Sequence, residues 1–247
     1  MNSQTKTALI TGGAKRIGAA IVETLHAAGY DIFLHYGKSE DAAKQLSNKL
    51  NGIREDSCRI FSADLKNHHQ VSTISNWVKN HTDSLDILVN NASVFSPTPW
   101  PSADKQDWES IFSTNVQTPF FLTQALLELI TVNHGSVVNL IDIHADRTLE
   151  DHPIYCASKS ALKSLTLSLA KDHGHQLRCN GISPGAILWP ENEGEMPSEA
   201  QQAILKKIPM QRLGNEKNIA DTVLFLCTND YINGQIINVD GGRTTFS

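Results

Sequence analysis

The sequence predicts an α/β fold: one doubly wound parallel sheet with helices on both faces. Short apolar segments alternate with amphipathic segments along the 247 residues, which is the pattern of parallel strands joined by crossover helices. A glycine-bearing turn, Thr11 to Gly18, directly follows the first apolar segment, as in a dinucleotide-binding unit. The chain has no internal repeat, low-complexity segment or linker, so we expect residues 1–247 to form a single domain.

Composition and charge argue against several classes of protein. The formal net charge is −5 and no basic stripe offsets it, which argues against a nucleic-acid partner. No apolar run approaches the ~20 residues that span a bilayer, and the N-terminus has no apolar signal core. The four cysteines are widely spaced, without a C-x-x-C pair. We therefore expect neither a zinc site nor disulfides, and infer a cytoplasmic location.

The first strand is expected at Thr7–Ile10, and the helix after the glycine turn ends at Gly29, its C-cap. Glycines allow the backbone to approach a pyrophosphate, and a helix N-terminus offers free N–H groups to it. We therefore expect the turn to bind a dinucleotide, with Gly12, Arg16 and Ile17 among the contacting residues.

The second strand, Asp31 to His35, lacks the acidic residue that an NAD-selective site usually places at the strand end. Lys38, Ser39 and the earlier Arg16 supply hydrogen-bond donors instead. Such donors suit a 2′-phosphate, so NADP is favoured over NAD. The alternative is that Lys38 and Arg16 are only solvated charges; the missing acid and the gained cations together argue against it.

The next elements continue the alternation. A helix is expected at 41–50, a strand at 59–63, a helix near 71–78 and a strand at 85–89. Asp64, followed by Leu65, stands at a strand end, where its carboxylate either receives an adenine amino group or caps the following helix. At the next strand end, Asn91, Ala92 and Ser93 are small or amide residues that allow close approach of the cofactor ribose.

The loop Ser93–Pro101 is rich in proline and aromatic residues, so we expect it to be ordered enough to line a pocket. Phe95 either stacks on a flat ring or packs within the loop, and physics alone supports both equally. A helical stretch, Asp107 to Leu129, is expected to be interrupted near Thr118–Pro119. Proline removes one backbone donor and frees an upstream carbonyl, so a bound water can persist near Asn115.

The chemistry is expected where the strand 137–141 ends in Asp142 and a helix running to Lys171 begins. Tyr155 and Lys159 are four positions apart and therefore project from one face of that helix. We expect the ammonium group to lower the phenol pKa from about 10, which suits general acid catalysis. The alternative is that such a pair is commonplace on solvated helices.

The C-terminal part completes the sheet. A strand is expected at 176–182, helices at 199–207 and 218–227, and a last strand at 235–239. Pro184 and Gly185 follow a strand, as Gly12, Asn91 and Asp142 do, so one cleft can hold them all. The polar segment after Gly185 predicts a substrate lid over about residues 186–207. No metal site is expected, because His68-His69 and His173-x-His175 are typical of solvated helix ends.

Taken together, these residues resemble the short-chain dehydrogenase/reductase family over nearly the whole chain. The matching motifs are the glycine turn at 11–18, Asn90-Asn91-Ala92, Asn115, Tyr155-x-x-x-Lys159 and Pro184-Gly185. Arg16 stands where the family commonly has its middle glycine, Asp142 where it has its catalytic serine, and Ser93 where it has a further glycine. These departures, with the stretches 35–39 and 90–99, resemble the pteridine reductase branch.

The resemblance implies a Rossmann-type fold, NADPH as cofactor, a homotetramer, and hydride transfer to a dihydropterin such as dihydrobiopterin, dihydromonapterin or dihydrofolate. It implies that Tyr155 and Asp142 deliver the proton, that Lys159 binds the nicotinamide ribose and tunes Tyr155, and that Asn115 holds a relay water. It further implies that Phe95 stacks on the pterin, that Ser93 contacts the pterin or the phosphates, and that Arg16 lies near both. The C-terminal tail, 243–247, matches less well.

Two other functions stay open. A carbonyl reductase, such as a 3-oxoacyl-carrier-protein reductase, is disfavoured by Asp142 and by the Phe95 loop, because a ketone site favours a neutral hydroxyl donor beside the tyrosine. A binding protein that senses NADP without catalysis is disfavoured by the intact Tyr155–Lys159 pair.

Overall fold

The computed structural model describes residues 6–67, 69–189 and 198–245. Its strands form one seven-stranded sheet in the order β3-β2-β1-β4-β5-β6-β7. Every neighbouring pair is parallel. The order runs outward in both directions from β1 and β4, which confirms the predicted doubly wound α/β fold.

The elements lie close to their predicted positions. The strands are β1 (Thr7–Ile10), β2 (Asp31–Tyr36), β3 (Cys58–Ser62), β4 (Ile87–Asn90), β5 (Ser136–Leu140), β6 (Arg178–Pro184) and β7 (Ile236–Val239). The α-helices are α1 (Arg16–Ala27), α2 (Glu40–Ile53), α3 (His69–Lys79), α4 (Lys105–Phe112), α5 (Thr118–Val132), α6 (Pro153–Asp172), α7 (Ser198–Lys206) and α8 (Glu216–Thr228). A π-helix, η1 (Ser113–Gln117), joins α4 to α5, and a 3-10 turn, η2 (Ile143–Ala145), follows β5.

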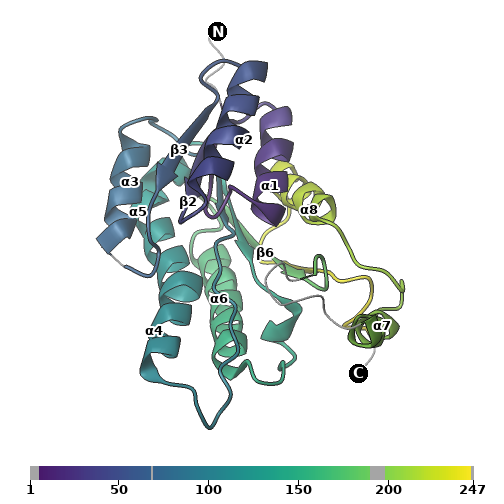
Figure 1. Cartoon of the computed structure of the whole chain (residues 1–247). Coiled ribbons are helices and arrows are strands. Elements are labelled where there is room, and N and C mark those ends of the chain that lie inside the picture. The colour runs from purple at the N-terminus through teal and green to yellow at the C-terminus, as the bar shows by residue number, and fades with distance from the viewer. Residues whose placement is uncertain (1–5, 68, 190–197, 246–247) are drawn as a thin grey trace.

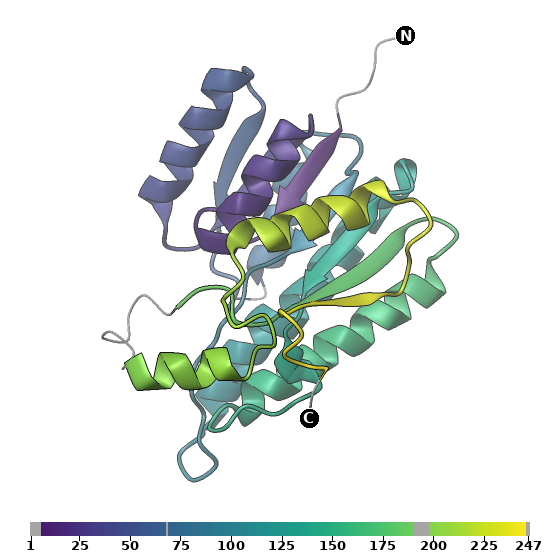
Figure 2. The same cartoon turned by 90° about the vertical axis from the view of Figure 1, so that its right-hand side faces the viewer.

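Two apolar cores lie on opposite faces of the sheet, beneath the helices that Figures 1 and 2 show on either side of it. Ile10 and Leu34 pack with α1, α2 and α8, whereas Leu9 and Phe33 pack with α3, α5 and α6. Neighbouring strand residues point to opposite faces, so a nearly continuous apolar strand supplies both cores at once. Helices on both faces leave the carboxyl edge of the sheet as the place where polar side chains can gather.

Several boundaries differ from the sequence prediction. Strand β6 continues through Pro184, so Ser183 and Pro184 belong to the strand itself. Gly29 has a φ of +95° and follows Ala28, the C-cap of α1. The interruption predicted near Thr118–Pro119 is the π-helix η1, which ends directly before it.

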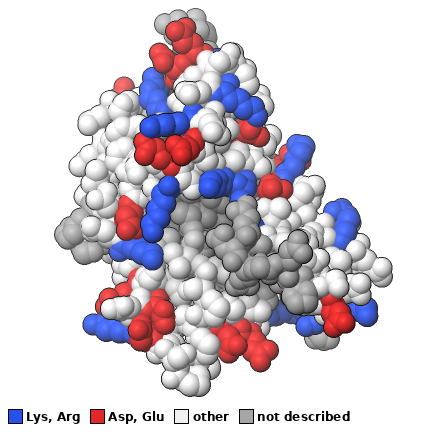
Figure 3. Space-filling model, viewed as in Figure 1, with Lys and Arg blue, Asp and Glu red and all other residues white. Residues whose placement is uncertain are grey.

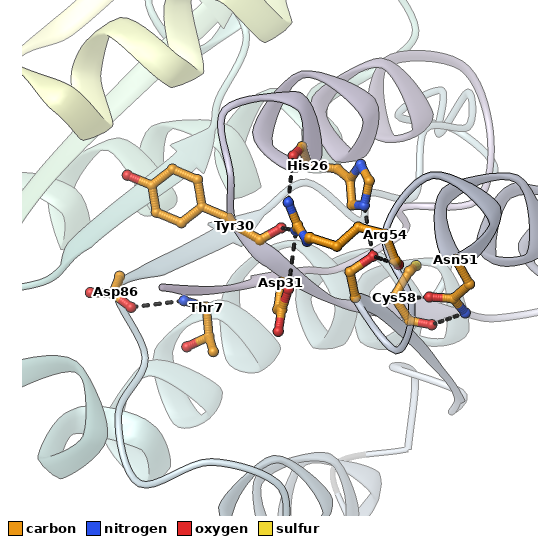
Figure 4. Close-up of polar contacts among 9 residues, drawn as sticks. Thr7, His26, Tyr30, Asp31, Asn51, Arg54, Cys58 and Asp86 are labelled. Carbon is orange, nitrogen blue, oxygen red and sulfur yellow. Dashed lines mark hydrogen bonds and ion pairs between the residues drawn. The ribbon is translucent and has the colours of Figure 1, made fainter. Parts of the chain in front are cut away.

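A polar cluster fixes α1 to the amino end of the sheet (Figure 4). The Arg54 guanidinium donates to the His26 and Tyr30 carbonyls and pairs with Asp31 at 3.0 Å. His26 Nε2 lies 2.7 Å from the Ser57 hydroxyl. Burial, with help from the charge of Arg54, lowers the pKa of His26. The cluster therefore holds the helix that starts at the glycine turn.

Among the helices described, none is long and apolar enough to cross a membrane.

Candidate active site

A cleft of about 830 Å³ opens at the carboxyl edge of the sheet. It brings together the predicted residues of the glycine turn, of the ends of β2 to β6 and of α6. Those lining it are Gly12, Arg16, Ile17, His35, Lys38, Asp64, Leu65, Asn91, Ala92, Ser93, Phe95, Asp142, Tyr155, Lys159, Pro184 and Gly185. Two predicted site residues, Ser39 and Asn115, do not line it. Ser39 instead directly precedes α2.

The glycine turn is shaped from beneath by two side chains. Gly12 has a φ of +64° and donates its N–H to His35 Nδ1 over 3.2 Å. His35 Nε2 lies 3.1 Å from the Ala63 carbonyl, which only accepts, so Nε2 carries the proton and the ring is neutral. Burial lowers the pKa of His35, in agreement with that tautomer. Asn91 Nδ2 donates to the Thr11 and Gly12 carbonyls.

Arg16 occupies the position in the turn where glycine was expected, and its φ of +53° is the left-handed conformation that glycine adopts most easily. Such backbone strain in a non-glycine residue is commonly found at functional sites. Its guanidinium donates to the Trp189 carbonyl over 3.2 Å, so it reaches from the turn to the segment that follows β6. Residues 190–197, the middle of the predicted lid, lie outside the described residues.

The rim of the cleft is basic although the chain is acidic as a whole. Lys15, Arg16, Lys38 and Lys66 line it, against the carboxylates of Asp64 and Asp142. Figure 3 shows Lys and Arg side chains around the middle of this face. The Asp64 carboxylate accepts from the Lys66 N–H over 3.1 Å and so closes a local turn. An anionic ligand lying along the turn therefore meets more positive than negative charge.

The strand-end carboxylate and the helix pair converge deeper in the cleft. The Tyr155 hydroxyl donates to Asp142 Oδ2 over 2.8 Å, and Asp142 Oδ1 accepts the His144 N–H over 2.8 Å. Lys159 Nζ donates to the Leu140 carbonyl over 2.9 Å and lies 5.6 Å from the centroid of the Tyr155 ring. Both Tyr155 and Lys159 are buried. A phenol, a carboxylate and an amine thus share one site.

The structure corrects the predicted effect of Lys159 on Tyr155. The pKa of Tyr155 is raised well above its ordinary value, first by burial and then by the adjacent charge of Asp142. Burial also lowers the pKa of Lys159 to about 8, although the charge of Asp142 opposes this. The prediction was wrong because it considered the helix spacing alone: the nearest charged group is the carboxylate, which donates nothing and favours the protonated phenol.

Asn115 lies beneath the cleft, in the π-helix. Its Oδ1 accepts from the Val94 N–H and the Ser93 hydroxyl, and its Nδ2 donates to the Val94 carbonyl and the Ser158 hydroxyl, over 2.8–3.2 Å. Ser158 in turn donates to the Tyr155 carbonyl over 2.7 Å. Asn115 therefore ties the loop after β4 to the helix that carries Tyr155.

Several residues at the site were not predicted from the sequence: Lys15 and Lys66 line the cleft, and His152 packs against Phe95. The ring of Phe95 meets the Tyr155 ring edge-on, with centroids 4.8 Å apart, and is stacked against His152, with centroids 4.6 Å apart. His152 stands three residues before Tyr155, directly ahead of α6. Helical spacing from Tyr155 could have placed it on the same side.

No cluster of potential metal ligands occurs among the described residues, and the four cysteines are free.

The chain matches the family model described as enoyl-(acyl carrier protein) reductase over residues 12–244. It is 33% identical to pteridine reductase 1 of Leishmania tarentolae, over 95% of each chain. It is 29% identical to nodulation protein G of Rhizobium sp. (strain N33), over 96% of each chain. It is also 29% identical to a 3-oxoacyl-(acyl-carrier-protein) reductase of Staphylococcus aureus, over 96% of this chain and 98% of the relative. From the family match and these full-length relatives we conclude that the chain is an oxidoreductase of the short-chain dehydrogenase/reductase family.

Proposed function

We propose that this protein is an NADPH-dependent reductase of dihydropterins, with dihydrobiopterin, dihydromonapterin or dihydrofolate as candidate substrates. The observation that carries the proposal is the carboxylate of Asp142 hydrogen-bonded to the Tyr155 hydroxyl, beside the exposed ring of Phe95. A flat heterocycle with ring nitrogens and amino groups offers a surface to stack and both donors and acceptors for such a pair. The 33% identity to a pteridine reductase supports it.

The charges that line the cleft support a dinucleotide with an extra phosphate as the proposed cofactor. The N-terminus of α1 faces it and supplies free N–H groups for a pyrophosphate. Arg16 and Lys38, with Lys15 and Lys66, would surround a 2′-phosphate, and no acidic side chain at the end of β2 would repel it. NADPH, when bound, supplies the hydride.

The chain's own residues would manage the proton. The raised pKa of Tyr155 keeps the hydroxyl protonated at neutral pH. Because it also makes the phenol a weaker acid, proton donation would depend on the bound substrate and Lys159 stabilising the phenolate. Asp142 would orient that hydroxyl through Oδ2. The lone pairs of the carboxylate that remain beside the bond from the His144 N–H would accept from an amino group of the substrate. Lys159, whose pKa is lowered to about 8 by burial, would hold the nicotinamide ribose from the Leu140 side of the cleft. Asn115 would keep Ser93 and Tyr155 in register, and a relay water there is part of the proposal.

The second candidate is reduction of a 3-oxoacyl thioester, favoured by the Tyr155–Lys159 pair and by the relatives at 29% identity. The test compares turnover of dihydrobiopterin and acetoacetyl thioester with NADPH, in the wild type and in Asp142→Ser. Preference of the wild type for dihydrobiopterin, lost in Asp142→Ser, supports the pterin. Preference for the thioester in both proteins refutes it. Turnover of either substrate excludes a protein that only senses NADP.

We also propose a homotetramer in a reducing cytoplasm, the latter supported by the free cysteines. Exposed apolar side chains on α5 and α6 support self-association: Phe120, Phe121 and Leu167 are 44%, 45% and 42% exposed. They lie along helices that flank an apolar groove of about 210 Å³. Phe120→Glu together with Leu167→Glu should reduce the native mass measured by light scattering.

A further inference from the structure

The ring of Phe95 has one covered face and one free face. His152 stacks on it with an interplanar angle of 17° and a centroid distance of 4.6 Å. Phe95 lines the cleft, whereas His152 does not, so the imidazole covers the face that is turned away from the cleft. Phe95 is nevertheless 54% exposed. The face that remains available to a ligand is therefore the one that looks into the cleft.

The imidazole of His152 is itself held in place. Its Nδ1 lies 2.6 Å from the Glu150 carbonyl, which only accepts, so Nδ1 carries the proton. The His152 N–H donates to the Leu149 carbonyl over 3.2 Å. One residue earlier, the Asp151 carbonyl accepts the Thr98 N–H over 2.6 Å, which ties the Phe95 loop to the start of α6 a second time. The ring is thus a fixed backing for Phe95.

We propose that His152 is a positioning residue that holds Phe95 edge-on to Tyr155 and so selects flat heteroaromatic substrates. The proposal deepens the pterin reductase function above and rests on it. Without the imidazole, Phe95 loses its only stacking partner among the described residues, and rotation about its side-chain bonds is no longer opposed from behind. A ligand must then order the ring of Phe95 itself, and the free energy that this costs weakens its binding. The reacting groups, Tyr155 and Asp142, are left unchanged.

The chemistry of the His152 ring indicates that its flat surface matters more than its nitrogens. Nε2 is buried and has no hydrogen-bond partner among the described residues. A phenyl ring lacks that unsatisfied nitrogen and keeps the stacking surface. His152→Phe should therefore restore what His152→Ala loses, which a role for the imidazole as acid or base would not allow.

The experiment measures KM and kcat for dihydrobiopterin with NADPH in the wild type, His152→Ala and His152→Phe. Calorimetry measures the Kd of 2,4-diaminopteridine and, separately, of NADPH. An aromatic pair of this kind corresponds to a change of about threefold to tenfold. We expect KM and the Kd of diaminopteridine to rise by that factor in His152→Ala, with kcat within about twofold and the Kd of NADPH unchanged. His152→Phe should return both to near wild type, and exposed His175→Ala is the matched control.

A double-mutant cycle with Phe95→Leu completes the test. If His152 acts through Phe95, His152→Ala has no further effect in the Phe95→Leu protein. Unchanged pterin KM in His152→Ala, equal losses for NADPH and pterin, or failure of His152→Phe to rescue would each overturn the proposal. A wild type that neither reduces dihydrobiopterin nor binds diaminopteridine would overturn the pterin function and this inference together, whereas wild-type binding with unaffected variants overturns the inference alone.

Discussion

Removing the charge of Asp142 tests the centre of the proposed mechanism. The carboxylate receives two hydrogen bonds of 2.8 Å, one from the Tyr155 hydroxyl and one from the His144 N–H. A hydrogen bond to a charged group contributes about 1.5–3 kcal/mol. If the bond to Tyr155 aligns the proton donor in the transition state, its loss lowers kcat by about tenfold to 150-fold. Asp142→Ala removes both bonds and the charge, whereas Asp142→Asn keeps the shape and an acceptor oxygen.

The assay follows NADPH oxidation with dihydrobiopterin across a range of pH. Asp142→Asn should melt close to the wild type yet lose most of the turnover that Asp142→Ala loses, with an unchanged Kd for NADPH. Because the charge of Asp142 helps to raise the pKa of Tyr155, the alkaline limb of kcat/KM should move to lower pH in both variants. The reasoning is refuted if either variant keeps wild-type turnover, or if the limb stays where it is.

Four further outcomes are expected. Lys38→Ala should weaken NADPH binding by about tenfold and leave NADH binding unchanged, because the exposed cation would meet only the extra phosphate; fluorescence titration with each dinucleotide measures this. Lys159→Met should abolish turnover yet raise the free energy of unfolding at pH 7 by on the order of 1–3 kcal/mol in urea titrations, because burial lowers the pKa of Lys159 to about 8. Burial lowers the pKa of His26 and His35 from 6.5, so the folded chain binds fewer protons than the unfolded chain below that pH. The contribution of these two histidines to the free energy of unfolding should therefore be fully present above about pH 6.5 and be lost as the pH falls below it, and His26→Gln should reduce the fall. Pro119→Ala should lower kcat without lowering the melting temperature, because it restores an N–H that can bond the Asn115 carbonyl; equal kcat in the two proteins would contradict this.

Much of the fold could be predicted because strand ends and helix starts have local signals. The glycine turn, the apolar strands and the missing acid after β2 each lie within a few residues of the chain, and the structure places Gly12, Lys38 and Asn91 in one cleft. The pKa of Tyr155 could not be predicted in this way. It depends on the depth of burial and on a carboxylate from another element, neither of which the spacing of Tyr155 and Lys159 contains.

His152 was missed for a related reason. Its ring is defined by a contact across two loops, and the residues that hold it there, Glu150 and the Asp151–Thr98 pair, act through backbone carbonyls. Carbonyl positions have no side-chain signature in a sequence. By contrast, Asp142 was found because an acid ends a strand where the resembled family has a serine, and Phe95 because it lies in a loop rich in proline and aromatic residues.

The π-helix decides what Asn115 can do. An asparagine side chain has two donors and an oxygen with two lone pairs, and in Asn115 all four are used by Ser93, Val94 and Ser158. The side chain therefore has no capacity left for the relay water that the resemblance implies. The main-chain carbonyl of Asn115 is different, because the residue four positions later is Pro119, which has no N–H to donate to it. A water that relays protons at this point would have to bind this carbonyl, whereas the side chain serves to hold the π-helix against the loop after β4.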